Sequence, residues 1–507
     1  MMTLKKLLSE RAGKFGEKTF MYFRDRAFSY NEVNDAANRV GTGLAKLGVK
    51  KGGKVCLLIE NRPEFVISFF GPHKIGAVPV PINSNFKASE VEFIASNSGA
   101  TAIIASPQFM DMVRNVQSRV SALKHIIVLG DDLYGALPFD AFLAEGAQEP
   151  EASVVPEDEA SIIYTSGTSG KPKGVVLTHD NYCFDAESIA EGINLTEADR
   201  LMCILPLYHT NGHVVTLISP LMAGADLILA EGFTPSTFFA DLERYEATGF
   251  GAVPTIYSIL LDLPDGSEHD LSRLRMGLCG AAPMPVEVFI EFEKRFHVPI
   301  IEGYGLSEGT CASCINPPDG KRKIGSVGLP LQGHEMNIVD ESGKTLGPGE
   351  TGEIVMRGRQ VMKGYYKNPE ATSETIRDGW LHTGDFGRRD EEGFFYVIGR
   401  KKDMIIRGGA NVYAKEVEDV LYEHPAVKEA AVVGLPHKIW GEEVVACVIL
   451  KDRARTSQEE LIYHTQKHLA DYKCPKQIFF MKDFPRTATG KIRKRMLVDQ
   501  ILKKEGR

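Results

Sequence analysis

Residues 54–82 read KVCLLIENRPEFVISFFGPHKIGAVPVPI, and this pattern decides the fold class. Lys54–Glu60 is a short apolar run typical of a buried strand, and Ala77–Ile82 is a second one. Between them, Pro63–Ile75 begins with a proline and has the length of a helix. Strands that alternate with helices in this way predict a largely parallel sheet covered by helices.

The same alternation continues further along the chain. The additional elements that it predicts are strands at Thr101–Ala105, His125–Gly130, Leu201–Leu205, Asp226–Ala230 and Leu274–Cys279, and helices at Glu90–Asn97, Pro235–Thr248 and Pro285–Phe296. From about Gly325 the pattern becomes turn-rich and predicts an antiparallel β region. Beyond Lys402 it becomes α+β, with helices at Ala414–Glu423 and Gln458–Leu469 around two strands, so a domain boundary is expected near Lys402.

Composition narrows the class of protein. The 507 residues are 43% hydrophobic and 25% charged, with a formal charge of −8, and a nucleic-acid binder would show a basic excess instead. There is no secretory signal pattern, no apolar run long enough for a transmembrane segment and no terminal Ser-Lys-Leu, so we expect a cytoplasmic protein. The eight cysteines are expected to be reduced, and the CxxC spacing of Cys311 and Cys314 is interpreted as coincidence.

The segment Tyr164–Gly174, YTSGTSGKPKG, directly follows an apolar run and predicts a loop that leaves a strand. Its hydroxyls, its flexible backbone and Lys173 could bind an anion, although an isolated run of this kind is more often a solvated linker. A Walker-type loop is excluded, because Pro172 stands where that motif needs a serine or threonine.

Four later segments supply support for a phosphate-binding interpretation. They are Gly280-Ala281-Ala282-Pro283, the run EGYGLSE from Glu302 to Glu308, the run WLHTGD that ends at Asp385, and the run PRTATGK that ends at Lys491. Tyr304 could stack on a base, Glu308 could hold Mg²⁺, and Asp385 with Arg400 could bind a ribose. Each segment alone would more simply be a surface turn.

Together, YTSGTSGKPKG, YGLSE, HTGD, GRKKDMIIRGG and PRTATGK resemble the motifs of the adenylate-forming enzymes, in that family's order. This family includes acyl-CoA synthetases, peptide-synthetase adenylation domains and beetle luciferases. The resemblance spans nearly the whole chain, from Phe28 to Lys491. It implies an N-terminal domain (residues 1–400) of two α/β subdomains plus a β-barrel, a hinge (401–402) and a small α+β C-terminal domain (403–507).

The resemblance also implies the chemistry. A carboxylate attacks the α-phosphorus of ATP and expels pyrophosphate, and the thiol of CoA then displaces AMP from the acyl-adenylate. The residues that it assigns to ATP are Thr165, Ser166, Gly167, Thr168, Ser169, Gly170, Lys173, Gly280, Ala281, Ala282, Gly303, Tyr304, Gly305, Ser307, Asp385 and Arg400. Thr165 and Glu308 would hold Mg²⁺, and the catalytic residues would be Lys491, His209 and Glu308.

The second half-reaction implies a domain rotation about Lys402. This rotation would withdraw Lys491 and bring Arg407, Gly408 and Gly409 toward CoA. The chain departs from many relatives at Ala414, where they have a proline, and this puts in doubt only whether the nearby loop has the same geometry.

For the acid, the acyl pocket is expected to contain His209, Thr210, Asn211, Gly212, Val214, Gly303 and Gly305. Glycine at 305, where relatives specialised for acetate have tryptophan, favours a medium- or long-chain fatty acid. Three alternatives stay open: an aryl or carnitine-like acid, an enzyme that loads a carrier protein, and an inactive nucleotide-binding module. A homodimer also stays open.

Overall fold

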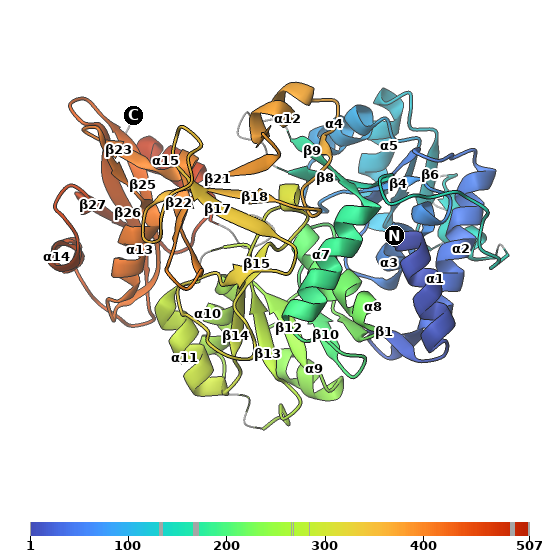
Figure 1. Ribbon diagram of the computed structural model, residues 1–507, viewed down its shortest axis with the longest axis horizontal. Helices are drawn as coiled ribbons and strands as arrows, with labels where there is room; N and C mark the ends of the chain where they lie inside the picture. The colour runs from blue at the N-terminus through green and yellow to red at the C-terminus, as the bar shows by residue number, and fades with distance from the viewer. Residues whose placement is uncertain are drawn as a thin grey trace.

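The computed structural model describes residues 2–130, 135–144, 146–165, 172–264, 266, 268–282, 284–486 and 492–504. Figure 1 shows helix-covered sheets at the right and centre, and a smaller unit with the C-terminus at the left. The expected fold class, a large N-terminal region of α/β sheets followed by a small α+β region, is confirmed.

The first sheet contains the two strands predicted within residues 54–82. Its strand order is β4 (Val78–Pro81), β3 (Lys54–Leu58), β5 (Ala102–Ala105), β6 (His125–Val128) and β7 (Leu137–Pro138), and all its pairings are parallel. The helices of this region are α1 (Leu4–Phe15), α2 (Tyr30–Lys46), α3 (Pro63–Lys74), α4 (Ala88–Ser98), η1 (Pro107–Phe109), α5 (Met110–Arg119) and α6 (Phe139–Leu143). Strands β4 and β5 are completely buried, and so are β3 and β6 after their first residues, as is usual for a parallel sheet packed between helices.

The second sheet is the largest. Its order is β16 (Leu329–Pro330), β15 (Cys314–Ile315), β14 (Ile300–Tyr304), β13 (Met276–Cys279), β12 (Gly249–Ala252), β10 (Arg200–Cys203), β11 (Asp226–Leu229), β1 (Thr19–Phe23) and β2 (Arg26–Ser29). The six strands from β14 to β1 are parallel. Its helices are α7 (His179–Gly192), the π-helix η2 (Asn211–Ile218), α8 (Ser219–Ala223), α9 (Phe238–Arg244), α10 (Pro254–Asp262) and α11 (Val286–Phe296). In such sheets ligands bind beyond the carboxyl ends of the strands, which here are the ends of β13 and β14.

Two smaller sheets complete the N-terminal region. In one, β9 (Lys173–Thr178) pairs with β8 (Glu159–Thr165) and with β19 (Gly364–Tyr365). The other is antiparallel and contains β17 (Glu335–Val339), β18 (Gly352–Arg357), β21 (Trp380–Arg389), β20 (Ile376–Arg377) and β22 (Phe395–Arg400). The short helices η3 (Ser307–Gly309) and α12 (Pro369–Thr375) lie between these strands in the sequence.

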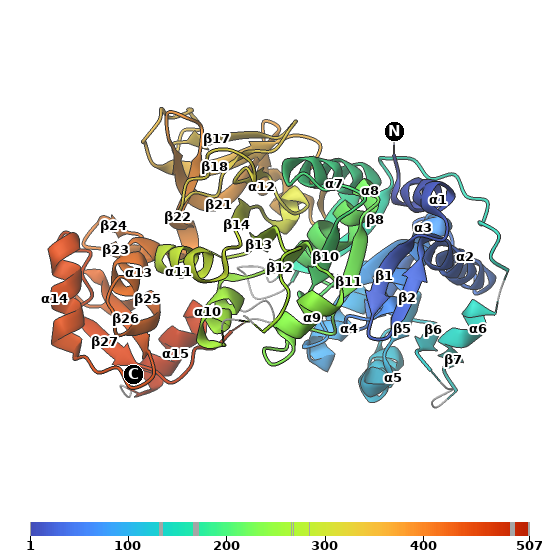
Figure 2. The ribbon, with the colours of Figure 1, turned by 90° about the horizontal axis from the view of Figure 1, so that it is seen from below.

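The C-terminal unit begins after the 3₁₀ turn η4 (Lys401–Asp403). Its sheet contains β24 (Ala410–Val412), β23 (Ile405–Arg407), β26 (Gly441–Leu450), β25 (Val427–His437) and β27 (Gln477–Phe480), with helices α13 (Ala414–Tyr422), α14 (Gln458–His468) and α15 (Lys494–Lys504). Figure 2 shows α14 at the outer edge of this unit, and α10 and α11 beside its opposite side. The unit has a hydrophobic core of its own, formed mainly by α13, β25 and β26.

Two further sequence predictions can be compared with the structure. All eight cysteines are free, and burial raises the pKa of both Cys311 and Cys314. A raised pKa keeps a thiol protonated, whereas the thiolate is the reactive form of cysteine. The raised pKa values are therefore consistent with the interpretation that the CxxC spacing is a coincidence. Among the described residues, none of the helices combines the length and the apolar character needed to cross a bilayer.

Gly328 joins the second sheet to the antiparallel sheet and provides a test of the fold. Its carbonyl accepts the N–H of Phe395 at 2.9 Å, its φ is +94°, and a Cβ there would lie 2.0 Å from the carbonyl carbon of Ile315. We expect Gly328→Ala to destabilise the protein by about 2–4 kcal/mol, seen as a lower thermal-melting midpoint. Gly320→Ala is the matched control, since Gly320 has φ +106° but open space around it. An equal shift for both variants would contradict the expected backbone collision.

Candidate active site

Three residues from separate strands meet at a buried carboxylate. Asp385 of β21 is only 3% exposed, and it lies opposite Arg400 in the pairing of β21 with β22. The hydroxyl of Tyr304, at the end of β14, donates to Oδ2 of Asp385 at 2.6 Å, and Nε of Arg400 lies 2.9 Å from Oδ1. Burial and the charge of Asp385 raise the pKa of Tyr304 well above its ordinary value, so its hydroxyl remains a donor. Each carboxylate oxygen keeps a second acceptor site, which could receive a ribose hydroxyl.

The expected adenine-binding segment follows β13 directly. Gly280, Ala281 and Ala282 are all partly exposed, and Ala281 adopts the left-handed conformation with φ +71°. Non-glycine residues in this strained backbone conformation occur preferentially at ligand-binding sites and active sites. A Cβ at Gly280 would lie 3.4 Å from the carbonyl oxygen of Gly303 and 3.7 Å from the side-chain nitrogen of Asn211. The structure therefore brings the ends of β13, β14 and η2 together.

A second cluster forms at the edge of the β8–β9 hairpin. The hydroxyl of Tyr365 donates to Oε1 of Glu308 at 2.8 Å, and Nζ of Lys173 lies 4.9 Å from the centre of the same ring. Thr165 is paired with Lys173 across the hairpin, and Ser307 precedes Glu308 in η3. The N–H of Met362 also donates to the carbonyl of Glu308 at 2.8 Å. Lys173, Thr165 and Glu308 thus lie at one place, and their assignment to ATP (Lys173, Thr165) and to Mg²⁺ (Thr165, Glu308) remains a prediction.

Tyr365 was not identified from the sequence. The sequence feature that could have pointed to it is the pair of tyrosines in residues 363–370, KGYYKNPE. Gly364 and Tyr365 of this segment form the strand β19, which pairs with β9. Sequence analysis also passed over Glu302 as a titratable group. Glu302 lies in the middle of β14 with its carboxyl group buried, and burial raises its pKa to about 8, while the charge of Lys415 in α13 opposes this shift.

Some expected site residues lie outside the described part of the chain. They are the loop residues Ser166, Gly167, Thr168, Ser169 and Gly170, and the expected catalytic lysine, Lys491. Their assignments remain predictions.

The expected acyl pocket begins with His209, which is partly exposed and has its ring 4.8 Å from that of Tyr208. Thr210 is the N-cap of the π-helix η2, and Asn211 is its first residue; this rare geometry occurs mostly at functional sites. Gly212 is buried, and Val214 is completely buried in the N-terminal core, so neither residue lines an open surface here.

The interpretation of Gly305 as open space for substrate is wrong. A Cβ built on Gly305 would lie 1.8 Å from the carbonyl oxygen of Cys311 and 2.8 Å from the Cα of Ala312. The chain folds back after Glu308 and fills the side-chain direction of this glycine with backbone. At Gly303 the same direction is also occupied, by Ile315 at 3.1 Å. Gly305 therefore permits close packing of two backbone segments.

The expected hinge and CoA-binding loop lie at the start of the C-terminal unit. Lys402 is exposed in the middle of η4. Gly408 and Gly409 are exposed and connect β23 to β24 with φ values of +58° and +84°, as a type I′ hairpin turn requires. Arg407 is half-buried, and its Nε lies 2.5 Å from Oε1 of Glu443. In this arrangement Arg407 is committed to an ion pair within its own unit.

Comparison with known proteins identifies the class. The family model for the AMP-binding enzyme matches residues 8–366, and the model for the AMP-binding enzyme C-terminal domain matches residues 416–491. The chain belongs to this family, the adenylate-forming superfamily, in its acyl-CoA synthetase branch. It is an acid–thiol ligase of the AMP-forming type.

Individual relatives cover almost all of the chain. A long-chain-fatty-acid–CoA ligase of Bacillus subtilis (strain 168) is 35% identical over 98% of this chain and 94% of its own length. The anthranilate CoA ligase AuaEII, solved with anthranoyl-AMP, superposes with a TM-score of 0.92 at 33% identity, covering 99% of this chain and 97% of that one. ATP-bound MatB from Rhodopseudomonas palustris has a TM-score of 0.92 at 31% identity, covering 98% and 99%.

Tyr365 provides a test of the second cluster. We expect Tyr365→Phe to slow ATP–pyrophosphate exchange about ten- to a hundredfold, because Glu308 loses a hydrogen bond to its charged group. The defect should be measured against Mg²⁺ concentration. Tyr366→Phe is the control, since the neighbouring hydroxyl donates to the backbone carbonyl of Ser98. Exchange that stays normal in Tyr365→Phe would contradict this role.

Proposed function

We propose that this protein uses ATP and Mg²⁺ to activate a medium- or long-chain fatty acid and then transfers the acyl group to CoA. The observation that supports it best is the placement of the two clusters on one short segment. Tyr304 and Glu308 lie four positions apart, and they contact Asp385 and Tyr365 respectively. A ribose at Asp385 would therefore place the phosphates of the same nucleotide toward Glu308 and Lys173.

In the first half-reaction, a carboxylate oxygen of the acid forms a bond to the α-phosphorus of ATP. The bond between that phosphorus and the bridging oxygen breaks, and pyrophosphate leaves. Because both reactants are anions, preorganised charge and positioning supply most of the catalysis. Asp385 would hold the ribose hydroxyls, Lys173 would neutralise the leaving group, and Lys491 would join the carboxylate to the α-phosphate.

The site also fits Mg²⁺. The carboxylate of Glu308 and the hydroxyl of Thr165 are oxygen donors, the type that this hard cation prefers. One oxygen of Glu308 accepts a hydrogen bond from Tyr365, which orients the carboxylate. When bound, the ion would neutralise charge on the phosphates.

In the second half-reaction, the sulfur of CoA forms a bond to the acyl carbon and AMP leaves with the oxygen electrons. We infer that the C-terminal unit (403–507) rotates about Lys402 relative to residues 1–400 between the two steps. The exposed 3₁₀ turn η4 leaves the backbone free to absorb such a rotation. Arg407 would have to exchange Glu443 for a new partner if it contacts CoA.

The choice of a fatty acid no longer rests on Gly305. It rests on the similarity to the Bacillus subtilis fatty-acid ligase. The second candidate is an aryl acid, favoured by the similarity to the anthranilate ligase. Loading of a carrier protein is a third candidate, distinguished by its acceptor.

A panel of acids separates these candidates. We expect kcat/KM for AMP release to rise along the linear series from acetate to octanoate, because each buried methylene contributes roughly 0.8 kcal/mol, or about fourfold. Benzoate and anthranilate provide the aryl comparison, and each acid is assayed with CoA and with a phosphopantetheinyl carrier protein. A preference for the aromatic acids, or for the carrier protein, would contradict the corresponding part of the proposal.

Lys491→Ala separates the two half-reactions. We expect pyrophosphate exchange to fall about a thousandfold, since a charged contact to the transition state is lost. Thioester formation from a supplied acyl-adenylate should persist near the wild-type rate. Lys494→Ala is the control, because Lys494 is bound to Glu418 at 2.6 Å within the same unit. Equal loss of both half-reactions in Lys491→Ala would show that the role assigned to this lysine is wrong.

A further inference from the structure

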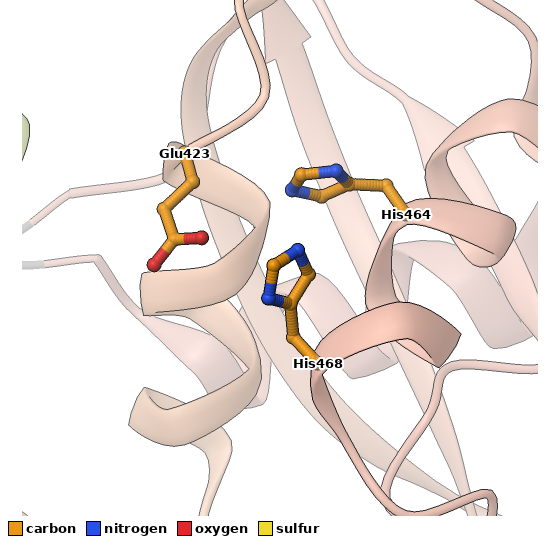
Figure 3. Close-up of side chains that lie close together, drawn as sticks. All are labelled: Glu423, His464 and His468. Atoms are coloured by element: carbon orange, nitrogen blue, oxygen red, sulfur yellow. The ribbon is translucent and has the colours of Figure 1, made fainter.

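A cluster of two imidazoles and a carboxylate lies on the C-terminal unit, away from the candidate active site. Glu423 caps the end of α13, and His464 and His468 lie on α14. Figure 3 shows the two rings and the carboxylate turned toward a common space between the helices. One potential ligand atom from each residue lies within 4.8 Å of the other two. Figure 1 places α14 at the outer end of the molecule.

Helix geometry brings the two histidines together. Residues four apart lie one turn above each other on the same face of a helix. The pair His464 and His468 therefore forms two arms of a chelate, and α13 supplies a third arm from Glu423. Two histidines on one helix and a glutamate from another element form a known ligand set for zinc.

A contact with α13 holds the imidazole ring of His464 in place. Its Nε2 lies 3.0 Å from the carbonyl oxygen of Val420, near the end of α13, which fixes the ring against the neighbouring helix. Glu423 and His468 are exposed, so an ion can reach the cluster from solvent.

We propose that Glu423, His464 and His468 bind a divalent transition-metal ion, with Zn²⁺ as the preferred ion and water at the remaining position. Imidazole nitrogens select Zn²⁺ over Mg²⁺ and Ca²⁺, which prefer oxygen ligands. Ligands of a tetrahedral zinc ion lie about 3.4 Å apart, so small side-chain rotations would complete the site. This inference is independent of the proposed acid substrate.

The binding experiment uses the full-length chain without a histidine tag, after removal of metal with a chelator. Calorimetric titration with zinc chloride should show binding of one ion per chain, and magnesium chloride should show none at the same place. His468→Ala, His464→Ala and Glu423→Gln should each weaken zinc binding by about tenfold or more. A wild type that binds no zinc, or variants that bind zinc like the wild type, would overturn the proposal.

Two controls distinguish loss of a ligand from general damage. His269→Ala removes a histidine that lies 2.8 Å from Glu243 elsewhere on the chain, and it should leave zinc binding unchanged. The three cluster variants should retain the circular-dichroism spectrum of the zinc-free wild type and its pyrophosphate-exchange rate in the presence of Mg²⁺. A zinc-dependent rise in the melting temperature should appear in the wild type and in His269→Ala, and it should disappear in His468→Ala. The same rise in His468→Ala would contradict the assignment.

Discussion

The carboxylate of Asp385, held by the hydroxyl of Tyr304 and the guanidinium of Arg400, is the interaction on which the candidate site depends. It joins the end of the large parallel sheet to the antiparallel sheet. An almost fully buried carboxylate would be costly without such partners. Arg400 remains 46% exposed at the boundary of the C-terminal unit, so the same ion pair lies directly before η4, the proposed hinge.

The segment that follows β14 carries this arrangement to the phosphate end of the site. Tyr304 contacts Asp385, and four residues later Glu308 contacts Tyr365. Tyr365 belongs to a strand paired with β9, whose first residue is Lys173. A single short segment thus positions groups from three sheets. A change in its backbone would disturb both the contact of Tyr304 with Asp385 and the contact of Glu308 with Tyr365.

Sequence alone predicted the elements well because their signals are local. The run at 54–58 and the proline at the start of α3 are visible within a few residues. The meeting of Asp385 with Arg400 could be anticipated only through family resemblance, since their contact depends on strand pairing. The contact of Tyr365 with Glu308 spans 57 positions and has no local signature.

The error at Gly305 has a different cause. A sequence shows that a side chain is absent, but it does not show which atoms fill the vacated space. Here Thr310 adopts φ +65°, its hydroxyl donates to the carbonyl of Gln360 at 2.6 Å, and the chain turns back so that Cys311 lies against Gly305. The substrate-size argument failed because it treated a backbone contact as a pocket.

The seam between the two units combines weak contacts with a protected buried acid. Lys428 and Asp262 form an ion pair at 2.6 Å across it, but their side chains are 32% and 58% exposed, and exposed pairs of this kind contribute little. Glu302 lies buried on the N-terminal side, with the charge of Lys415 as the opposing influence on its raised pKa. Lys415 and Asp419 both lie on α13 and shift the pKa of Glu302 in opposite directions, so burial, the largest cause, accounts for its rise to about 8. The carboxyl group of Glu302 is therefore protonated at neutral pH in this arrangement, and it places no unpartnered negative charge in the interior.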